Sequence, residues 1–196
     1  MANTTTGNDS VPDIDVPLVG VASKDRTNIL RHLLACEADP AHVKLWRQLA
    51  GILSAHAPLS VQTSGSLSVL FFVPDGKYRM QAFALEDQRD GTILVYLPDI
   101  LDKALKEKLI QPTDDPHGFS VGGRRGPQLR LQRLDSQNTP DPPPHFKNML
   151  GWNRRALRIT LIVANTPQAL VDATDKLCAV AVRTLVKPAS AKPAAK

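Results

Sequence analysis

The chain has 196 residues, of which 42% are apolar and 22% charged, with a formal net charge of +5 at pH 7. This length is enough for one domain with a hydrophobic core and flanking segments. No apolar run reaches 18 residues, and the N-terminus has neither the basic flank nor the apolar stretch of a secretory signal. We therefore expect a cytoplasmic protein with no membrane partner.

Both ends of the chain predict disorder. Residues 1–22 are rich in Thr, Asn and Asp and offer little to bury, so we expect a disordered leader. Residues 187–196 repeat Lys, Pro and Ala, which predicts a disordered basic tail. Residues 23–186 are left as a single domain.

Two helices are predicted at the start of this domain. Ser23 can cap a helix over 24–36, and Asp39 can cap a second one with Pro40 in its first turn. Apolar residues recur at helical spacing in both. The first stripe is Ile29, Leu30, Leu33 and Leu34, and the second is Val43, Trp46, Leu49 and Leu53.

A β-rich region follows. Runs at 67–73, 78–85 and 92–97 are separated by turns that contain Asp-Gly, a pair that tolerates the positive φ of hairpin turns. The sequence "LSVQT" before them is a further short strand candidate. A fourth long run, over 157–164, lies much later in the chain and is predicted to pair in the same sheet.

Two more helices are predicted, one directly after the strand over 92–97 and one directly after the strand over 157–164. Asp99 can cap "ILDKALKEKLI", and Thr166 with Pro167 can begin a final helix. The residues at helical spacing in this final helix are Leu170, Thr174, Leu177, Cys178, Ala181 and Leu185. Strands joined by tight turns, with helices before and after them, predict an α+β fold. We expect an antiparallel β-meander of about four to five strands with the helices packed on one face.

Residues 111–146 show no sustained apolar period, so we expect a long basic loop, rich in Pro and Gly, before the last strand. Within it, "QLRLQRL" alternates in its first part and predicts a short edge strand or ribbon, with Arg130 and Arg133 facing outward. Between His117 and Arg158, eight basic residues stand against two aspartates, a net charge of +6. The rest of the chain then carries −1, so the basic character is local.

Three interpretations of this basic region remain open. The glycines of "VGGRRG" could cradle a small phosphate, although no Lys-Ser/Thr of a P-loop follows. The region could instead be an arm that binds nucleic acid, with Phe119, Phe146 and Trp152 available for stacking. It could also be a solvated insertion, or one that docks on an acidic protein. The proline run 139–146 fits a semi-rigid spacer and could itself bind a partner with an aromatic groove.

Other clusters point less clearly to chemistry. His32 and Cys36 have the i, i+4 spacing of metal ligands but would need His42 or His56 as well, so we expect no metal site and read both cysteines as reduced core thiols. Asp114, Asp115 and His117 fit an exposed turn better than an acid–base site. We find no catalytic signature and expect no cofactor, and we leave enzymatic activity open while favouring its absence.

The preferred hypothesis is a non-enzymatic binding protein with an anionic partner, nucleic acid being slightly preferred over a small phosphate ligand. The alternative is an interaction or adaptor module that docks through the proline-rich loop. The predicted anion-binding residues are six arginines and one tryptophan: Arg124, Arg125, Arg130, Arg133, Trp152, Arg154 and Arg155.

Overall fold

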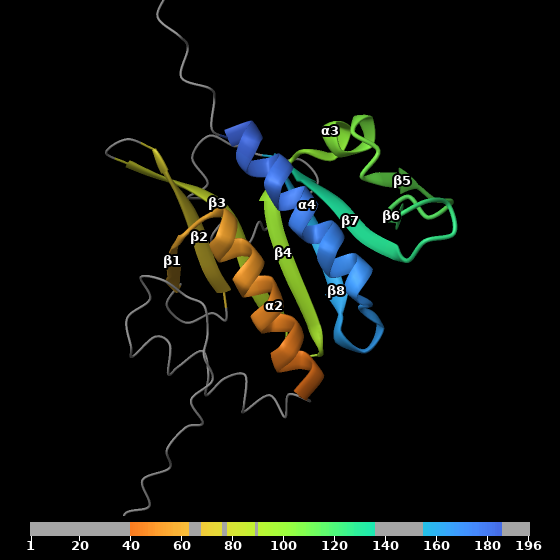
Figure 1. The fold of residues 1–196 in the computed structure, drawn as a ribbon, viewed down its shortest axis with the longest axis horizontal. Coiled ribbons are helices and arrows are strands. Elements are labelled where there is room, and N and C mark those ends of the chain that lie inside the picture. Colours follow the sequence, from red (N-terminus) through yellow and green to blue (C-terminus); the bar gives the residue numbers. More distant parts are fainter. Residues whose placement is uncertain (1–39, 63–67, 76–77, 89, 136–154, 186–196) are drawn as a thin grey trace, which may run out of the picture.

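The computed structural model describes residues 40–62, 68–75, 78–88, 90–135 and 155–185. They form one antiparallel sheet with helices packed on one side (Figure 1). The helices are α2 Pro40–His56, α3 Leu101–Lys106 and α4 Gln168–Leu185, with a 3-10 turn, η2, over Val163–Asn165. The strands are β1 Leu59–Gln62, β2 Ser68–Asp75, β3 Tyr78–Gln88, β4 Thr92–Pro98, β5 Ile110–Pro112, β6 Gly118–Val121, β7 Gln128–Asp135 and β8 Arg155–Ile162.

The predicted α+β class with antiparallel strands is confirmed. Strands β2, β3 and β4 form the expected meander, and β8 pairs with β4 through Val95 opposite Ile159. Val69 to Val73 are β-branched or bulky apolar residues that suit a strand with a buried face. Gly91 has a φ of 81°, which supplies the left-handed residue that the turn between β3 and β4 requires.

The expected strand number was too low. The described residues contain eight strands in the order β1-β2-β3-β4-β8-β7-β6-β5. The segment 111–135, expected as loop, supplies β6 and β7 and most of β5. β5 has three residues and β6 four, too short for an alternating pattern to emerge. β7 does form as the "QLRLQRL" strand, but it is not an edge strand because it pairs with both β6 and β8.

Helix α3 is shorter than the predicted helix over 100–110. It ends at Lys106, and Lys108 adopts a φ of 57°, a left-handed conformation that cannot continue a helix. The chain then enters β5 at Ile110. The predicted cap is also wrong, because the N-cap residue is Ile100 and makes no side-chain cap hydrogen bond. Asp99 lies one residue earlier, where its Oδ1 accepts a hydrogen bond from the backbone amide of Leu101 at 3.2 Å.

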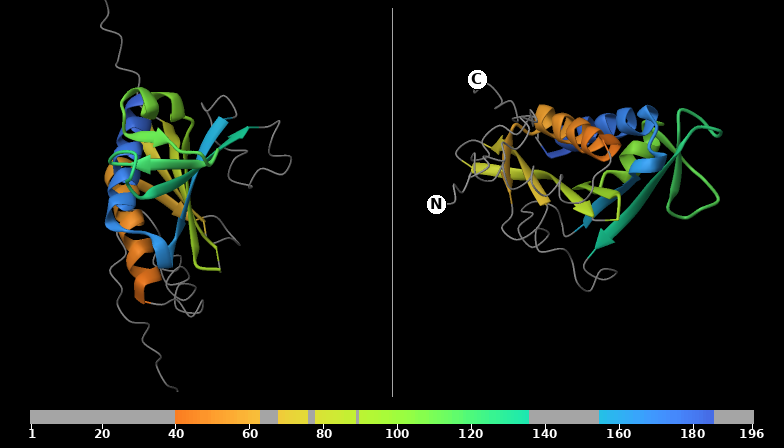
Figure 2. Two further views of the ribbon diagram at one scale, coloured as in Figure 1. Left: turned by 90° about the vertical axis from the view of Figure 1, so that its right-hand side faces the viewer. Right: turned by 90° about the horizontal axis from the view of Figure 1, so that it is seen from below.

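The main core lies between the sheet and helices α2 and α4, which cover the same face (Figure 2). The predicted stripes bury Trp46, Leu49 and Leu53 from α2, and Leu177 and Cys178 from α4. They pack on alternate residues of the central strands, since successive strand residues point to opposite faces. None of the described helices is long and apolar enough to cross a membrane.

The second face of the sheet carries a smaller cluster and a polar pairing. The cluster consists of Leu70, Ala84, Leu94, Tyr96 and Leu134. On the same face, Arg158 Nη2 of β8 donates a hydrogen bond to Gln132 Oε1 of β7. Burial raises the pKa of Tyr96, and neighbouring Glu86 adds to the shift. Arg158 is therefore built into the sheet and does not belong to an exposed basic surface.

Several expectations fall outside the described residues. They are the leader 1–22, the helix over 24–36 with His32 and Cys36, the proline run 139–146, Trp152 and Arg154, and the tail 187–196. They stay predictions.

Candidate anion-binding site

A tight turn between β6 and β7 presents two of the predicted arginines. The backbone amide of Gly126 donates to the carbonyl of Gly123 at 2.9 Å, which closes a four-residue turn with Arg124 and Arg125 in its two central positions. One step further out, the amide of Val121 donates to the carbonyl of Pro127 at 3.0 Å. The two arginines thus lie at the tip of a hydrogen-bonded hairpin.

The glycines of this turn are required by its geometry. Gly122 and Gly123 have φ values of 76° and 121°, which residues with a side chain rarely adopt. At Gly126 a Cβ would lie 1.7 Å from the carbonyl oxygen of Val121, so no other residue fits without moving the backbone. The sequence "GGRRG" therefore encodes a fixed turn around an arginine pair.

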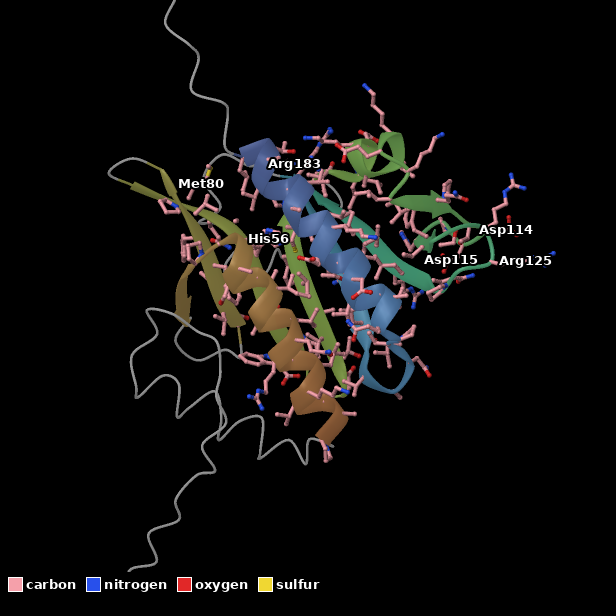
Figure 3. The ribbon with its side chains drawn as sticks, in the orientation of Figure 1. His56, Met80, Asp114, Asp115, Arg125 and Arg183 are labelled. Carbon is pink, nitrogen blue, oxygen red and sulfur yellow. The ribbon has the colours of Figure 1, made fainter. Side chains whose placement is uncertain are left out.

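Both arginines of the turn are exposed. None of the ion pairs formed between described residues involves Arg124 or Arg125. Arg125 extends away from the sheet at the outer edge of the domain (Figure 3). Asp114 and Asp115, also exposed, lie in the neighbouring connection between β5 and β6 and reduce the local positive charge. The turn still offers two guanidinium groups to a partner in solution.

Arg130 and Arg133 do not share a surface, contrary to expectation. They are three residues apart on β7, and the strand period of two places them on opposite faces. Arg130 is exposed and pairs across the sheet with Thr160. Arg133 is on the face of Leu131, which belongs to the main core. The predicted single basic surface is therefore divided.

Arg133 already has carboxylate partners. Its Nε lies 2.7 Å from Asp99 Oδ2, and its Nη2 lies 2.8 Å from Asp102 Oδ2. Partial burial opposes the charge on Arg133, but the hydrogen bonds and attraction to the two aspartates outweigh it and raise the pKa of the guanidinium. Arg133 thus connects β7 to the start of α3 and has little capacity left for an external anion.

Arg155 is exposed at the first residue of β8, opposite Asp135 at the last residue of β7. The turn with Arg124 and Arg125 precedes the first residue of β7. Seven residue steps along a strand span about 23 Å. Arg155 is therefore well separated from the turn, whereas Arg130 is the third residue of β7, the strand that follows the turn.

A cavity of about 330 Å³ lies close to this turn, where β7 begins and β8 ends. Its lining includes Arg130 of β7, Thr160 of β8, Asp115 of the β5–β6 connection, Thr166 just before α4, and Leu170 in the first turn of α4. These residues come from four separate segments of the chain, and nothing in the sequence indicated that they meet.

The turn predicted around Asp114, Asp115 and His117 is confirmed. Asp115 Oδ1 accepts a hydrogen bond from the backbone amide of His117 at 2.9 Å, and the amide of Gly118 donates to the carbonyl of Asp115 at 2.9 Å. A Cβ on Gly118 would lie 2.5 Å from Thr113 Oγ1, so the connection packs closely on this glycine. The backbone around Asp115 is fixed by these contacts.

The histidines of α2 pair with carboxylates. His42 Nε2 lies 2.9 Å from Asp87 Oδ1 of β3, and His56 Nε2 lies 2.7 Å from Asp175 Oδ1 of α4. The residues that the structure describes contain no group of three or more potential metal ligands. Cys178 is a buried free thiol in the core, and burial raises its pKa, so it is held as the unreactive thiol.

Comparison with protein-family models, with curated proteins and with solved structures gives no match for the chain. A proposal about function therefore depends on its own residues.

Proposed function

We propose that the protein is a binding protein for an anionic partner, with the β6–β7 turn as its main contact. The observation that carries this proposal is the pair Arg124 and Arg125, exposed at the centre of a turn that three glycines fix. A tight turn needs only residues that tolerate its φ and ψ angles, and exposed central positions accept many polar residues. Two adjacent arginines add charge and bidentate donors that the turn itself does not need.

The form of the turn favours an extended polyanion over a small enclosed phosphate. A phosphate cradle needs free backbone amides directed at the ligand. The Gly126 amide is used inside the turn, and Arg124 and Arg125 stand on a protruding tip. Guanidinium groups on a protruding tip suit contacts to successive phosphates of a nucleic acid backbone. We therefore propose nucleic acid as the partner class, with Arg130 as an additional contact on β7.

A binding assay with a matched charge control tests this proposal. Retention of a labelled oligonucleotide, single- or double-stranded, is measured at low salt for the wild type and for Arg124→Ala/Arg125→Ala. The control is Lys44→Ala/Arg47→Ala, which removes the same charge from two exposed positions of α2. We expect a loss of affinity of about tenfold or more for the turn variant and a clearly smaller loss for the control.

Equal losses in the two variants would show that only net charge matters and would contradict a site at the turn. Absence of retention by the wild type would contradict nucleic acid as the partner. In that case the alternative, docking on a protein through the proline run 139–146, becomes the favoured hypothesis, and its binding would change little with salt.

A further inference from the structure

The cavity beside the turn has one well-exposed apolar side chain and several polar ones. Leu129, Leu161 and Leu170 line it but are at most 5% exposed, whereas Ile162 of β8 is 46% exposed. Strand alternation places Ile162 on the same face of the sheet as Thr160 and its partner Arg130. Gln128 and Asn165 also line the cavity and are exposed. Its volume of about 330 Å³ lies at the lower end of the range of small-molecule pockets, which is about 300–1,000 Å³. A ligand that fits must be small and must have both an apolar part and polar groups.

Two opposite charges line this cavity without pairing. Arg130 and Asp115 are both lining residues, yet neither forms an ion pair with the other or with another described residue. Asp115 uses Oδ1 to accept from the amide of His117. Its Oδ2 has no such role among the described contacts. The cavity therefore offers a guanidinium and a carboxylate to the same ligand.

We propose that this cavity binds a small zwitterion of the α-amino acid class. A guanidinium matches a carboxylate with two parallel hydrogen bonds, and the carboxylate of Asp115 attracts an ammonium group. The side chain of the amino acid would then lie against the exposed Ile162. A simple anion would be repelled by the carboxylate of Asp115, and a simple cation would be repelled by the guanidinium of Arg130. A ligand that carries both charges therefore fits best.

This site goes beyond the polyanion contact and does not rest on it. Arg124 and Arg125 are not among the residues that line the cavity. The change Asp115→Asn should affect the two binding activities in opposite directions. It removes a negative charge near the turn, which should strengthen polyanion binding. It also removes the partner of the ammonium group, which should weaken ligand binding in the cavity.

Calorimetric titration of the full chain with each of the twenty common amino acids tests the proposal, because it measures affinity directly. We expect one or a few with an apolar side chain to bind. For the best ligand, its N-acetyl form and its amide should each bind at least tenfold more weakly, because each lacks one of the two charges.

Two single substitutions test whether Arg130 binds the ligand's carboxylate and whether Asp115 binds its ammonium group. Arg130→Gln and Asp115→Asn should each lower the affinity at least tenfold. Arg124→Ala/Arg125→Ala should leave it unchanged. Asparagine keeps an oxygen that can accept the His117 hydrogen bond, so Asp115→Asn should fold with an unchanged melting temperature. Arg130 is exposed, and its substitution should also leave the melting temperature unchanged.

Three results would overturn the proposal. One is the absence of binding by any of the twenty amino acids. Another is equal binding of the N-acetyl form or the amide, which would leave one charge without a role. The third is unchanged affinity in Arg130→Gln or Asp115→Asn when both variants are folded.

Discussion

His42 Nε2 of α2 lies 2.9 Å from Asp87 Oδ1 of β3, and both residues are only 4% exposed. Their contact joins the first turns of α2 to the β3–β4 hairpin, across the main core. Asp87 Oδ2 is buried and has no hydrogen-bond partner among the residues that the structure describes. The buried carboxylate therefore depends on a single imidazole for compensation.

Removal of that imidazole should destabilise the protein strongly. A buried charge that loses its partner costs about 3–5 kcal/mol. We expect His42→Ala to lower the free energy of unfolding by about 3 kcal/mol at neutral pH, measured by urea denaturation. Adding Asp87→Asn to His42→Ala should recover part of this loss because the uncompensated charge is gone. A double variant as unstable as the sum of the two single variants would contradict coupling between these residues.

The same pair predicts a pH dependence. Burial raises the pKa of Asp87 above its ordinary value of 3.8, although attraction to His42 opposes the shift. An acid with a raised pKa in the folded state favours folding when protonated, so its contribution to stability is lost as pH rises from 3.8 through the folded-state pKa. In Asp87→Asn this loss should be absent. Unfolding curves over that window check it, and identical pH profiles for variant and wild type would exclude Asp87 as the source.

Glycine substitutions should separate steric exclusion from backbone conformation. Gly126→Ala would place a Cβ 1.7 Å from a backbone oxygen, whereas Gly91→Ala meets no atom within 4 Å and has only a φ of 81° to maintain. We expect the second change to cost about 1–2 kcal/mol and the first to cost more and to weaken anion binding as well. Thermal unfolding of both variants measures this. Equal melting temperatures would mean that the β6–β7 turn adapts.

Arg133 should be dispensable for binding. Its side chain is 41% exposed and already contacts Asp99 and Asp102. We expect Arg133→Ala to lower stability by about 0–1 kcal/mol, the range for exposed ion pairs. Its oligonucleotide affinity should be close to that of Lys44→Ala, a single-charge control at an exposed position of α2. An effect as large as that of Arg124→Ala would instead place Arg133 in the binding site.

The parts of the fold that the sequence predicts are those with strong local patterns. Val69 to Val73 and the Asp-Gly turns indicate their strands directly, and Leu170, Leu177 and Cys178 indicate the last helix. β5 and β6 are too short for such a pattern and form because each pairs with a neighbouring strand. Lys108 shortens α3 by a backbone conformation that its residue type does not announce.

The candidate site was predictable only in part. The glycines of "GGRRG" indicate a turn with arginines, and the structure forms one. The separation of Arg130 from Arg133 follows from the strand period once β7 is known to be a strand with two neighbours. The cavity depends on four segments meeting at one end of the sheet. Contacts of that kind are set by the tertiary structure, and the local sequence around Asp115 or Thr160 does not indicate them.

The salt dependence of oligonucleotide binding tests the central proposal most directly. Each phosphate contact contributes about 0.9 to the slope of log affinity against log salt concentration on double-stranded DNA. We predict a steep negative slope for the wild type. For Arg124→Ala/Arg125→Ala the slope should be less steep, with a magnitude lower by about 2. A slope that is the same in wild type and variant would contradict contact between the β6–β7 turn and the phosphate backbone.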